Sequence, residues 1–234
     1  MTEASKSSME QTIYEHIKQA ILKRQLAPGT QLLEHVVSER FRASRTPIRA
    51  ALRKLALEGL VDLIPNRGAF VIQPTEEEVR EAYELRSKLE LMGLEMAAAR
   101  LTEEDYERMA KACREELEAL ERGDVAAALA ANKAFHSLLA RKSGNRFLAS
   151  MTEHLLDKTN IYLILYDLFY DAPYRAGIDP IPQGAQQHKA ILEALRSGRA
   201  SEASELLRAH IDLAIGDLKT ARPGYLSLED LWKA

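Results

Sequence analysis

The chain of 234 residues is 46% hydrophobic and 29% charged, a composition that fits a globular protein of one or two domains with a sizeable core. It has no uncharged apolar run long enough to cross a membrane, no secretion signal, and a single cysteine, Cys113, which excludes an internal disulfide, so we expect a cytoplasmic protein with no membrane partner. The net charge of −3 is divided unevenly, with +4 on residues 1–75 and −7 on the remainder, so a polyanion should meet the N-terminal part.

The first two predicted elements are helices. Residues 1–10 are read as a disordered lead-in, and the first helix is expected over residues 12–24, where apolar side chains recur at helical spacing. Residues 26–29, with the sequence Leu-Ala-Pro-Gly, should end this helix in a turn. The second helix is expected over residues 33–41, with its apolar residues on one side.

Residues 43–71 are the most informative stretch of the chain. Thr46 followed by Pro47 is a strong helix start, because a hydroxyl can cap the first free N–H groups and proline fits the first helical position. Gly59 is a natural stop just past the last turn. Between these signals the apolar residues fall on one face, which must pack inward. They are Ile48, Ala51, Leu52 and Leu55.

The connection between these two helices predicts a DNA-binding motif. Only residues 42–44 link them, and two short helices joined by about three to four residues are the helix-turn-helix pattern, whose second helix enters the major groove. Arginines recur every four residues along the second helix and should point roughly the same way. The expected DNA contacts in this motif are Arg42, Ser44, Arg45, Thr46, Arg49 and Arg53.

A hairpin is predicted after the helix pair. Residues 60–63 and 69–72 read as short strands, and the Pro-Asn-Arg-Gly sequence between them is turn chemistry, in which Gly68 should need a positive φ. The hairpin would form a wing with a cationic tip, and Asn66, Arg67 and Gly68 are further expected DNA contacts. The alternative is a small helical domain with a solvated arginine face, but the helix pair, the turn, the basic ridge and the basic wing agree with one another.

From Thr75 onward the chain is predicted to be entirely helical. The DNA-binding domain should cover residues 11–74, because Thr75 and Glu78 form a capping box that opens a long helix. Helices are expected over residues 75–100, 102–121, 124–142, 145–170, 183–197 and 200–219, with a loop over 171–181. The predicted fold class is mainly α: a winged helix-turn-helix of three helices and a hairpin, an antiparallel bundle of six or seven helices over residues 75–220, and a C-terminal tail over 221–234.

The N-terminal third of the chain is similar to a known family. Leu55 and four segments, APGT from Ala27, SRTPIR from Ser44, EGL from Glu58 and RGAFV from Arg67, resemble the winged-helix signature of GntR-family bacterial transcription regulators. This resemblance implies a homodimer that binds double-stranded DNA at a short, near-palindromic operator.

Three histidines in the helical part form a candidate metal site. Asn132 and His136 are four residues apart and share one helical face, while His188 and His210 lie on two other predicted helices beside apolar residues. Imidazoles on facing helices of a bundle can hold a divalent metal. From the residues alone, three histidines that serve only as hydrogen-bonded core residues are the more frequent case.

The surroundings of these histidines are similar to a second family. The run N-x-x-F-H ending at His136, followed by S-G-N at residues 143–145 and by His188 and His210, resembles the FCD ligand-binding domain of the FadR subfamily. The resemblance implies a divalent metal (zinc, nickel or manganese) held by Asn132 and the three histidines, and a small carboxylate effector bound with it. Many members have Asp where this chain has Asn132, and the neutral amide is a poorer ligand that leaves the site one charge more positive.

Three side chains are candidates for effector binding. By the same resemblance Arg86 lies where this domain often reaches its effector, and its fork can pair with a carboxylate in two places. The alternative is a helix-surface arginine paired with Glu90. Tyr162 and Tyr166 belong to an aromatic stripe that continues at Tyr170, and such a stripe more often packs in a core, although its hydroxyls could face a polar cavity.

The sequence thus predicts a transcription regulator that responds to a metabolite, with two alternatives. An architectural DNA binder would have an inert dimerisation bundle. A metal-dependent enzyme could use three histidines around an ion with open positions. Against the enzyme, no Asp or Glu stands at motif-like spacing to act as general base, and the sequence has no Gly-rich phosphate loop or nucleophile elbow.

Overall fold

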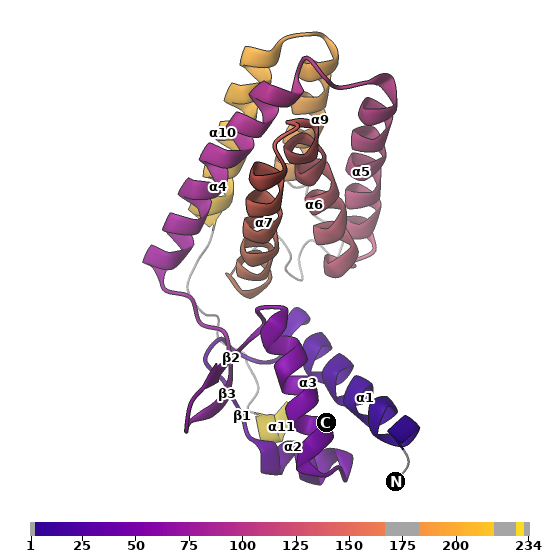
Figure 1. The fold of residues 1–234 in the computed structure, drawn as a ribbon, viewed down its shortest axis with the longest axis vertical. Helices are drawn as coiled ribbons and strands as arrows, with labels where there is room; N and C mark the ends of the chain where they lie inside the picture. Colours follow the sequence, from indigo (N-terminus) through magenta and orange to yellow (C-terminus); the bar gives the residue numbers. More distant parts are fainter. Residues whose placement is uncertain (1–2, 167–182, 218–227, 232–234) are drawn as a thin grey trace. The chain divides into compact units, whose positions relative to one another are not determined.

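The chain is built from two compact units (Figure 1). The computed structural model describes residues 3–166, 183–217 and 228–231. One unit consists of residues 1–74 with 220–234 and is called the winged unit below, and the other consists of residues 75–219 and is called the helical unit. The predicted mainly α architecture, a winged helix-turn-helix followed by a helical bundle, is confirmed.

The winged unit contains the helix-turn-helix and a small sheet. Its elements are α1 (Glu3–Leu22), β1 (Gln31–Leu32), α2 (Glu34–Phe41), α3 (Arg45–Leu57), β2 (Val61–Ile64) and β3 (Gly68–Val71). Strand β3 lies between β1 and β2 and runs antiparallel to both. The sequence does not predict β1, because a strand of two residues carries no periodicity. The strand forms only through its pairing with β3, which sets Gln31 opposite Phe70.

Helix α1 starts earlier than the sequence predicts. It begins at Glu3, so the expected start at residue 12 is wrong and most of the segment read as a disordered lead-in is helical. Residues 3–11 contain neither glycine nor proline, and most of them are ordinary helix formers such as Ala, Lys, Glu, Gln and Met. Nothing in this segment therefore stops the helix from extending toward the N-terminus.

Helices α1 and α3 pack against each other through an aliphatic core. Ile13, Ile17 and Ile21 of α1 and Ile48 and Leu55 of α3 are completely buried, as their helical spacing predicts. Full burial of one such side chain stabilises the fold by about 1.5–3 kcal/mol. This core fixes α3, the helix that the sequence predicts to enter the DNA groove.

A polar cluster ties the two helices together beside this core. The Tyr14 hydroxyl donates to the Glu58 carboxylate at 2.5 Å, and the Lys18 ammonium donates to the same group at 2.8 Å. The ammonium of Lys54 lies 4.0 Å from the centre of the Tyr14 ring. Burial, helped by the bond to Glu58, raises the pKa of the Tyr14 hydroxyl above its ordinary value. Tyr14 therefore stays a neutral donor and anchors the end of α3 to α1.

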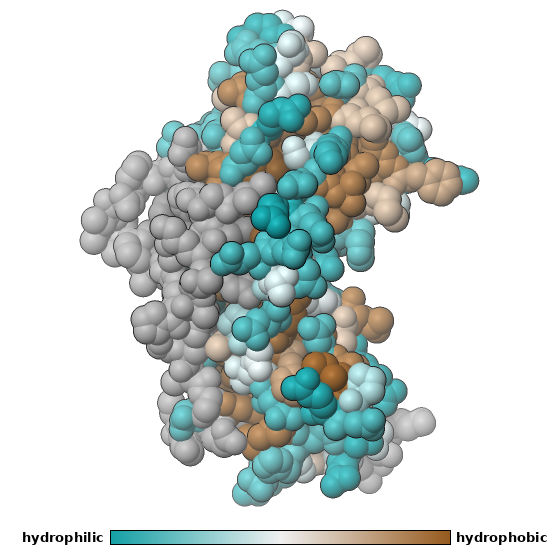
Figure 2. Space-filling model, turned by 90° about the vertical axis from the view of Figure 1, so that its left-hand side faces the viewer, coloured by the Kyte–Doolittle hydropathy of each residue, from teal (hydrophilic) through white to brown (hydrophobic). Residues whose placement is uncertain are grey.

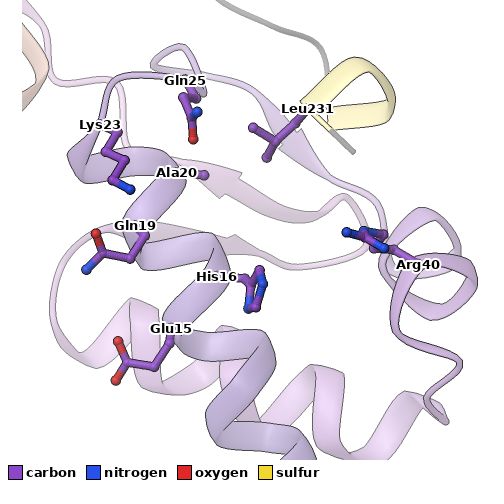
Figure 3. Close-up of a pocket in the computed structure, with 8 residues that line it drawn as sticks. All are labelled: Glu15, His16, Gln19, Ala20, Lys23, Gln25, Arg40 and Leu231. Carbon is purple, nitrogen blue, oxygen red and sulfur yellow. The ribbon is translucent and has the colours of Figure 1, made fainter. Parts of the chain in front are cut away.

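The end of the chain belongs to the winged unit. The sequence reads residues 221–234 as a tail, whereas a short helix, α11 (Leu228–Leu231), forms there with Leu228 buried. Two leucines three residues apart share one helical face, which gives the segment an apolar side to bury. Leu231 lines a hollow of about 450 Å³ together with side chains of α1 and α2, among them His16 and Arg40 (Figure 3). None of the predicted DNA contacts lines this hollow.

The helical unit has six helices in its described part. They are α4 (Glu76–Ala97), α5 (Glu103–Glu121), α6 (Val125–Lys142), α7 (Arg146–Tyr166), α9 (Gln183–Arg196) and α10 (Ala200–Asp217). Helix α6 packs against α4, α5 and α7, while α10 packs against α4 and α9. The predicted loop over residues 171–181, and Tyr170 before it, lie outside the described residues. Within the described ranges, no helix combines the length and the apolar character needed to cross a membrane.

The predicted helix starts in this unit are made by side-chain caps. Thr75 accepts from the backbone N–H of Glu78, whose carboxylate accepts from the backbone N–H of Thr75, and Thr102 and Asp105 form the same capping box on α5. Asp124 accepts from a backbone N–H of α6. Each box satisfies N–H groups that have no partner within the helix. Because these signals are local in the sequence, the helix starts could be predicted.

Candidate DNA interface and metal centre

The turn between α2 and α3 has the predicted length of three residues. Arg42 follows the last residue of α2 in a left-handed conformation, with a φ of 47°, and Ser44 precedes α3 in an extended one. The Ser38 hydroxyl donates to the carbonyl of Ala43 at 2.8 Å, which ties the turn back to α2. Ala43 is buried while Arg42 and Ser44 are exposed, so the turn presents its polar residues to solvent.

The start of α3 differs from the prediction, whereas its end agrees. The helix begins at Arg45, so the N-cap position is Ser44 and not Thr46, and the Ser44 side chain makes no capping hydrogen bond. Pro47 takes the third helical position, which it tolerates because the first four N–H groups have no partner within the helix. At the end, Gly59 has a φ of 76°, its N–H bonds to the carbonyl of Ala56, and the following N–H closes onto Leu55. This is the expected glycine stop.

Helix α3 is divided into a buried face and an arginine ridge. The four residues predicted to pack inward, Ile48, Ala51, Leu52 and Leu55, are all buried. Arg45, Arg49 and Arg53 are exposed. Four-residue spacing places these side chains above one another on one side of the helix. Three guanidinium groups on one exposed side suit a polyanion.

Arg49 of this ridge pairs with a carboxylate on the neighbouring helix. Its Nε donates to the Glu34 carboxylate of α2 at 2.7 Å, and both side chains are partly exposed. This hydrogen bond raises the pKa of Arg49 above its ordinary value. An exposed pair of this kind is worth little energy, so it holds Arg49 in position without competing strongly against DNA.

The wing is a tight hairpin anchored from the neighbouring strand. The N–H of Arg67 bonds to the carbonyl of Ile64 at 3.0 Å across Pro65 and Asn66, and Asn66 has a φ of 61°, as position three of a type II turn requires. Gly68 has a φ of 102°, so the predicted positive φ is confirmed.

The Arg67 side chain at the wing tip rests on a fixed backbone. The Gln31 amide of β1 donates to the Arg67 carbonyl at 2.8 Å. The Arg67 guanidinium lies 5.4 Å from the centre of the Phe70 ring, within cation–π range. The residue itself is exposed. The cationic tip, which the sequence predicts, is therefore held in part by a side chain of β1, a strand that the sequence does not predict.

The three histidines of the helical unit meet in its interior. His136 of α6 and His188 of α9 are completely buried, and His210 of α10 is 7% exposed. The Nε2 atom of His188 lies 3.0 Å from Nε2 of His136 and 3.1 Å from Nε2 of His210. The structure therefore brings together the residues that the sequence places on three separate helices.

Each histidine also has a partner on its other ring nitrogen. Nδ1 of His136 lies 2.5 Å from Glu90 of α4, and Nδ1 of His188 lies 2.7 Å from Glu116 of α5. Nδ1 of His210 lies 3.2 Å from the amide oxygen of Gln187. Sequence reasoning missed all three as partners of the histidines. Gln187 precedes His188 and Glu90 follows Arg86 by one turn, but only the packing of α5 against α9 brings Glu116 to the site.

These partners decide which ring nitrogen offers a lone pair. An ionised carboxylate only accepts hydrogen bonds, so the Nδ1 atoms of His136 and His188 must be donors and their Nε2 atoms acceptors. Two buried lone pairs 3.0 Å apart repel unless a cation lies between them. Two nitrogen–zinc bonds of about 2.0–2.1 Å each could span this separation. The three residues therefore fit a divalent metal.

The protonation states agree with this assignment. Burial lowers the pKa of the His136 imidazole to about 4, although the Glu90 carboxylate opposes the shift. Burial also lowers the pKa of His210 well below its ordinary value, and the neighbouring histidines act in the same direction. For Glu90, burial favours the neutral form, but nearby positive charge, that of Arg86 foremost, outweighs it and lowers the pKa to about 2. Neutral imidazoles beside an ionised carboxylate are the forms a metal requires.

Asn132 is a buried neighbour of the cluster. It lies one turn before His136 on α6 and is 6% exposed. Its amide nitrogen donates to the side-chain oxygen of Asn160 at 3.3 Å. The amide oxygen is then the atom that Asn132 can offer to a metal.

Arg86 pairs with Glu90, as one interpretation of the sequence expects, and is buried near the histidines' partners, as an effector-binding role would require. It pairs with Glu90 one turn later, with Nε 2.5 Å from the carboxylate, but the pair is buried, with each side chain only 2% exposed, and does not lie on the helix surface. A second nitrogen of Arg86 donates to the Thr159 hydroxyl at 3.1 Å. Of the two candidate tyrosines, Tyr162 is buried, while the side chain of Tyr166 lies outside the described residues.

Comparison with known proteins assigns one family model to the DNA-binding part of the chain and another to the helical unit. Residues 9–71 match the gntR family of bacterial regulatory proteins, and residues 81–213, more than half of the chain, match the FCD domain. The chain belongs to the GntR family and carries an FCD domain. The segments that carry the resemblance in the sequence lie within the matched ranges.

Relatives of similar length are transcription regulators. The chain is 28% identical over 200 residues to the HTH-type transcriptional regulator YdhC of Bacillus subtilis, covering 85% of this chain and 86% of the relative. It is 27% identical over 203 residues to the HTH-type transcriptional repressor RspR of Escherichia coli, covering 87% of this chain and 86% of the relative. This member of the GntR family is accordingly a DNA-binding transcription regulator and not an enzyme.

Solved structures share the fold. A GntR-type transcriptional regulator from Rhodococcus sp. RHA1 superposes with a TM-score of 0.64 at 23% identity, covering 89% of this chain and 96% of the other. McbR/YncC of E. coli gives a TM-score of 0.64 at 22% identity, covering 89% of this chain and 95% of the other.

Proposed function

We propose that this GntR-family regulator is a homodimer whose affinity for a near-palindromic operator is controlled by a small carboxylate effector, bound with a divalent metal in the helical unit. The observation that carries the proposal is the convergence of three imidazole Nε2 atoms whose Nδ1 atoms are already hydrogen-bonded. By likeness to RspR, whose name is that of a repressor, we propose that the DNA-bound state represses.

The proposed DNA contacts share one property, which is exposure. They are Arg42, Ser44, Arg45, Thr46, Arg49 and Arg53 of the helix-turn-helix and Asn66, Arg67 and Gly68 of the wing. In this proposal the α3 arginines read guanine edges or hold flanking phosphates, while the wing tip contacts the backbone or the minor groove. Release of counterions from the phosphates supplies the sequence-independent part of the affinity.

In the proposed metal centre, His136, His188 and His210 hold the ion through Nε2, with Asn132 as a weak fourth ligand. The bound ion would supply a Lewis-acid anchor for the carboxylate of the effector. The ligand atoms themselves carry no negative charge, so the charge of the ion is offset only by the carboxylates behind the histidines, and the remainder attracts an anion. Arg86 adds to that attraction, because a guanidinium can pair with a carboxylate, and its bonds within the described residues, to Glu90 and Thr159, use Nε and Nη1.

Helix α4 offers a route from the metal centre to the winged unit. It carries Arg86 and Glu90, and only residues 72–75 separate it from β3 of the wing. An effector changes operator affinity only if it binds two states of the protein unequally. In this proposal, effector binding redistributes the contacts of Arg86 and Glu90, shifts α4, and so changes how the winged units of a dimer are presented to DNA.

Exposed apolar side chains of the helical unit support a dimer. The large ones are Leu85, Met92 and Met96 on α4 and Phe147 and Met151 on α7, two helices that pack against each other. Figure 2 shows hydrophobic residues on one face of this unit, interrupted by hydrophilic ones. A palindrome is read by two recognition helices about 34 Å apart, which requires a dimer. We propose that the second copy of the chain covers the apolar residues of α4 and α7, because exposed apolar patches mark interaction sites.

We expect Arg49→Ala to weaken binding to the operator by about tenfold to a hundredfold, the scale of one good base contact. The fold should persist, because the side chain is exposed and lies off the buried face of α3. Fluorescence anisotropy with an operator selected from random DNA measures the change. The matched control is Glu34→Gln, which frees Arg49 and should not weaken binding. Unchanged affinity of Arg49→Ala would contradict the recognition-helix assignment.

Arg67→Ala should weaken binding to operator and to random DNA by similar factors, because a phosphate contact carries no sequence information. The slope of log affinity against log salt concentration should fall by about one unit. Titrations at several salt concentrations measure both quantities. A loss confined to the operator would mean that the wing reads bases.

Met92→Glu in the full chain should convert a dimer into a monomer at micromolar concentration, because it buries an unpaired charge in the proposed contact. Sedimentation velocity measures the change. Leu57→Glu is the matched control, since Leu57 is also an exposed apolar residue but belongs to the winged unit. A variant that sediments like the wild type would place the dimer contact elsewhere.

His188→Ala should remove the metal and abolish the response of DNA binding to carboxylic acids, while the metal-free protein still binds DNA. Elemental analysis of protein purified without chelator, and operator titrations with a panel of small acids, measure these two effects. His154→Ala, at an exposed histidine of α7, is the control and should keep its metal. Wild-type protein with neither metal nor acid response would favour the inert-bundle alternative.

A further inference from the structure

Two buried carboxylates stand directly behind the proposed metal ligands. Glu90 is 2% exposed and Glu116 is 5% exposed, and each accepts the Nδ1–H of one histidine. Buried carboxylates are rare unless they are paired or coordinate a metal. A neutral hydrogen-bonding residue would satisfy an imidazole N–H equally well, so the negative charges need a reason of their own.

The reason lies in the charge of the ligand set. Three neutral imidazoles and the neutral amide of Asn132 contribute no negative charge to a divalent ion. An uncompensated charge in a buried site is unfavourable, because the protein replaces little of the solvation that water gives. Carboxylates hydrogen-bonded to the far side of the ligands are the nearest groups that can offset it.

The two carboxylates are not equivalent. Glu90 already forms a buried ion pair with Arg86 at 2.5 Å, so one positive charge cancels much of its field. Within the residues that the structure describes, Glu116 forms no ion pair with a lysine or an arginine, and its partner is His188. The third ligand, His210, has only the neutral amide of Gln187 behind it. The hydrogen-bond partner of Nδ1 is thus an ion-paired carboxylate for His136, an unpaired carboxylate among the described residues for His188, and a neutral amide for His210.

We propose that Glu116 is the positioning residue that supplies the negative charge missing from the metal ligands. By accepting the Nδ1–H of His188, it fixes Nε2 as the lone-pair atom, raises the basicity of that ligand and offsets the charge of the ion. This inference rests on the metal centre of the proposed function. It adds that metal affinity depends on a residue of α5 that contacts no ion.

A purely structural role of Glu116 predicts something different. If it only satisfied a buried imidazole, Glu116→Gln would keep the hydrogen bond through the amide oxygen, and metal affinity would not change. The charge is the property that separates the two roles. Gln187 permits the reverse substitution, since Gln187→Glu places a carboxylate behind His210 with little change in shape.

The test measures zinc affinity of the full chain after removal of bound metal, by competition with a chromophoric chelator. Glu116→Gln should bind zinc about 10–100-fold more weakly, the usual cost of losing an outer-shell partner. Gln187→Glu should bind zinc more tightly, and the double variant should return toward the wild-type value. Glu115→Gln, at the exposed carboxylate next in sequence, is the control and should leave the affinity unchanged.

The outcomes separate this inference from the proposed function. Wild-type protein that binds no zinc, nickel or manganese would overturn the metal centre and the role of Glu116 with it. Zinc bound equally well by the wild type and by Glu116→Gln would overturn the role of Glu116 alone. If Glu116→Gln did not fold, an unchanged affinity of Gln187→Glu would overturn the charge argument by itself.

Discussion

Three imidazole nitrogens face one another inside the helical unit, and the ring nitrogens on their far sides are already hydrogen-bonded. Lone pairs so close together repel in an apolar interior, and the cation of the proposed metal centre would remove this repulsion. The helices around the cluster share this constraint, since α6, α9 and α10 carry the imidazoles while α4 and α5 carry the carboxylates behind them. The packing of five helices thus depends on how the charges and lone pairs of this cluster are balanced, a constraint that an aliphatic core would not impose.

Local signals explain what the sequence could predict. The Thr75 capping box, the Gly59 stop and the proline-containing wing turn depend on neighbours a few residues away, and they lie where expected. Features that depend on packing could not be predicted. Strand β1 forms only by pairing with β3, and α11 has too few residues to show a pattern. Glu116 reaches His188 only because α5 packs against α9. The histidine set was predicted from spacing and family resemblance together.

Arg86 has one property that the sequence predicts and one that depends on packing. Its pairing with Glu90 follows from the four-residue spacing and could be predicted. Its burial could not, because it results from the packing of α4 against α6 and α7. Burial changes the meaning of the pair: on the surface it would contribute little, whereas in the interior it fixes the ionised form of Glu90 and thereby the donor nitrogen of His136.

Helix α4 is where the separate requirements of such a regulator coincide. Its start follows the wing strand after four residues, one side places Glu90 against His136, and another leaves Leu85, Met92 and Met96 exposed. A rotation of this helix by a fraction of a turn would alter the metal centre and the proposed dimer face together, because one rigid rod carries both sets of side chains. In the proposed dimer, such shared mechanics would couple a small change at the ion to the spacing of two recognition helices, without a contact between effector and DNA.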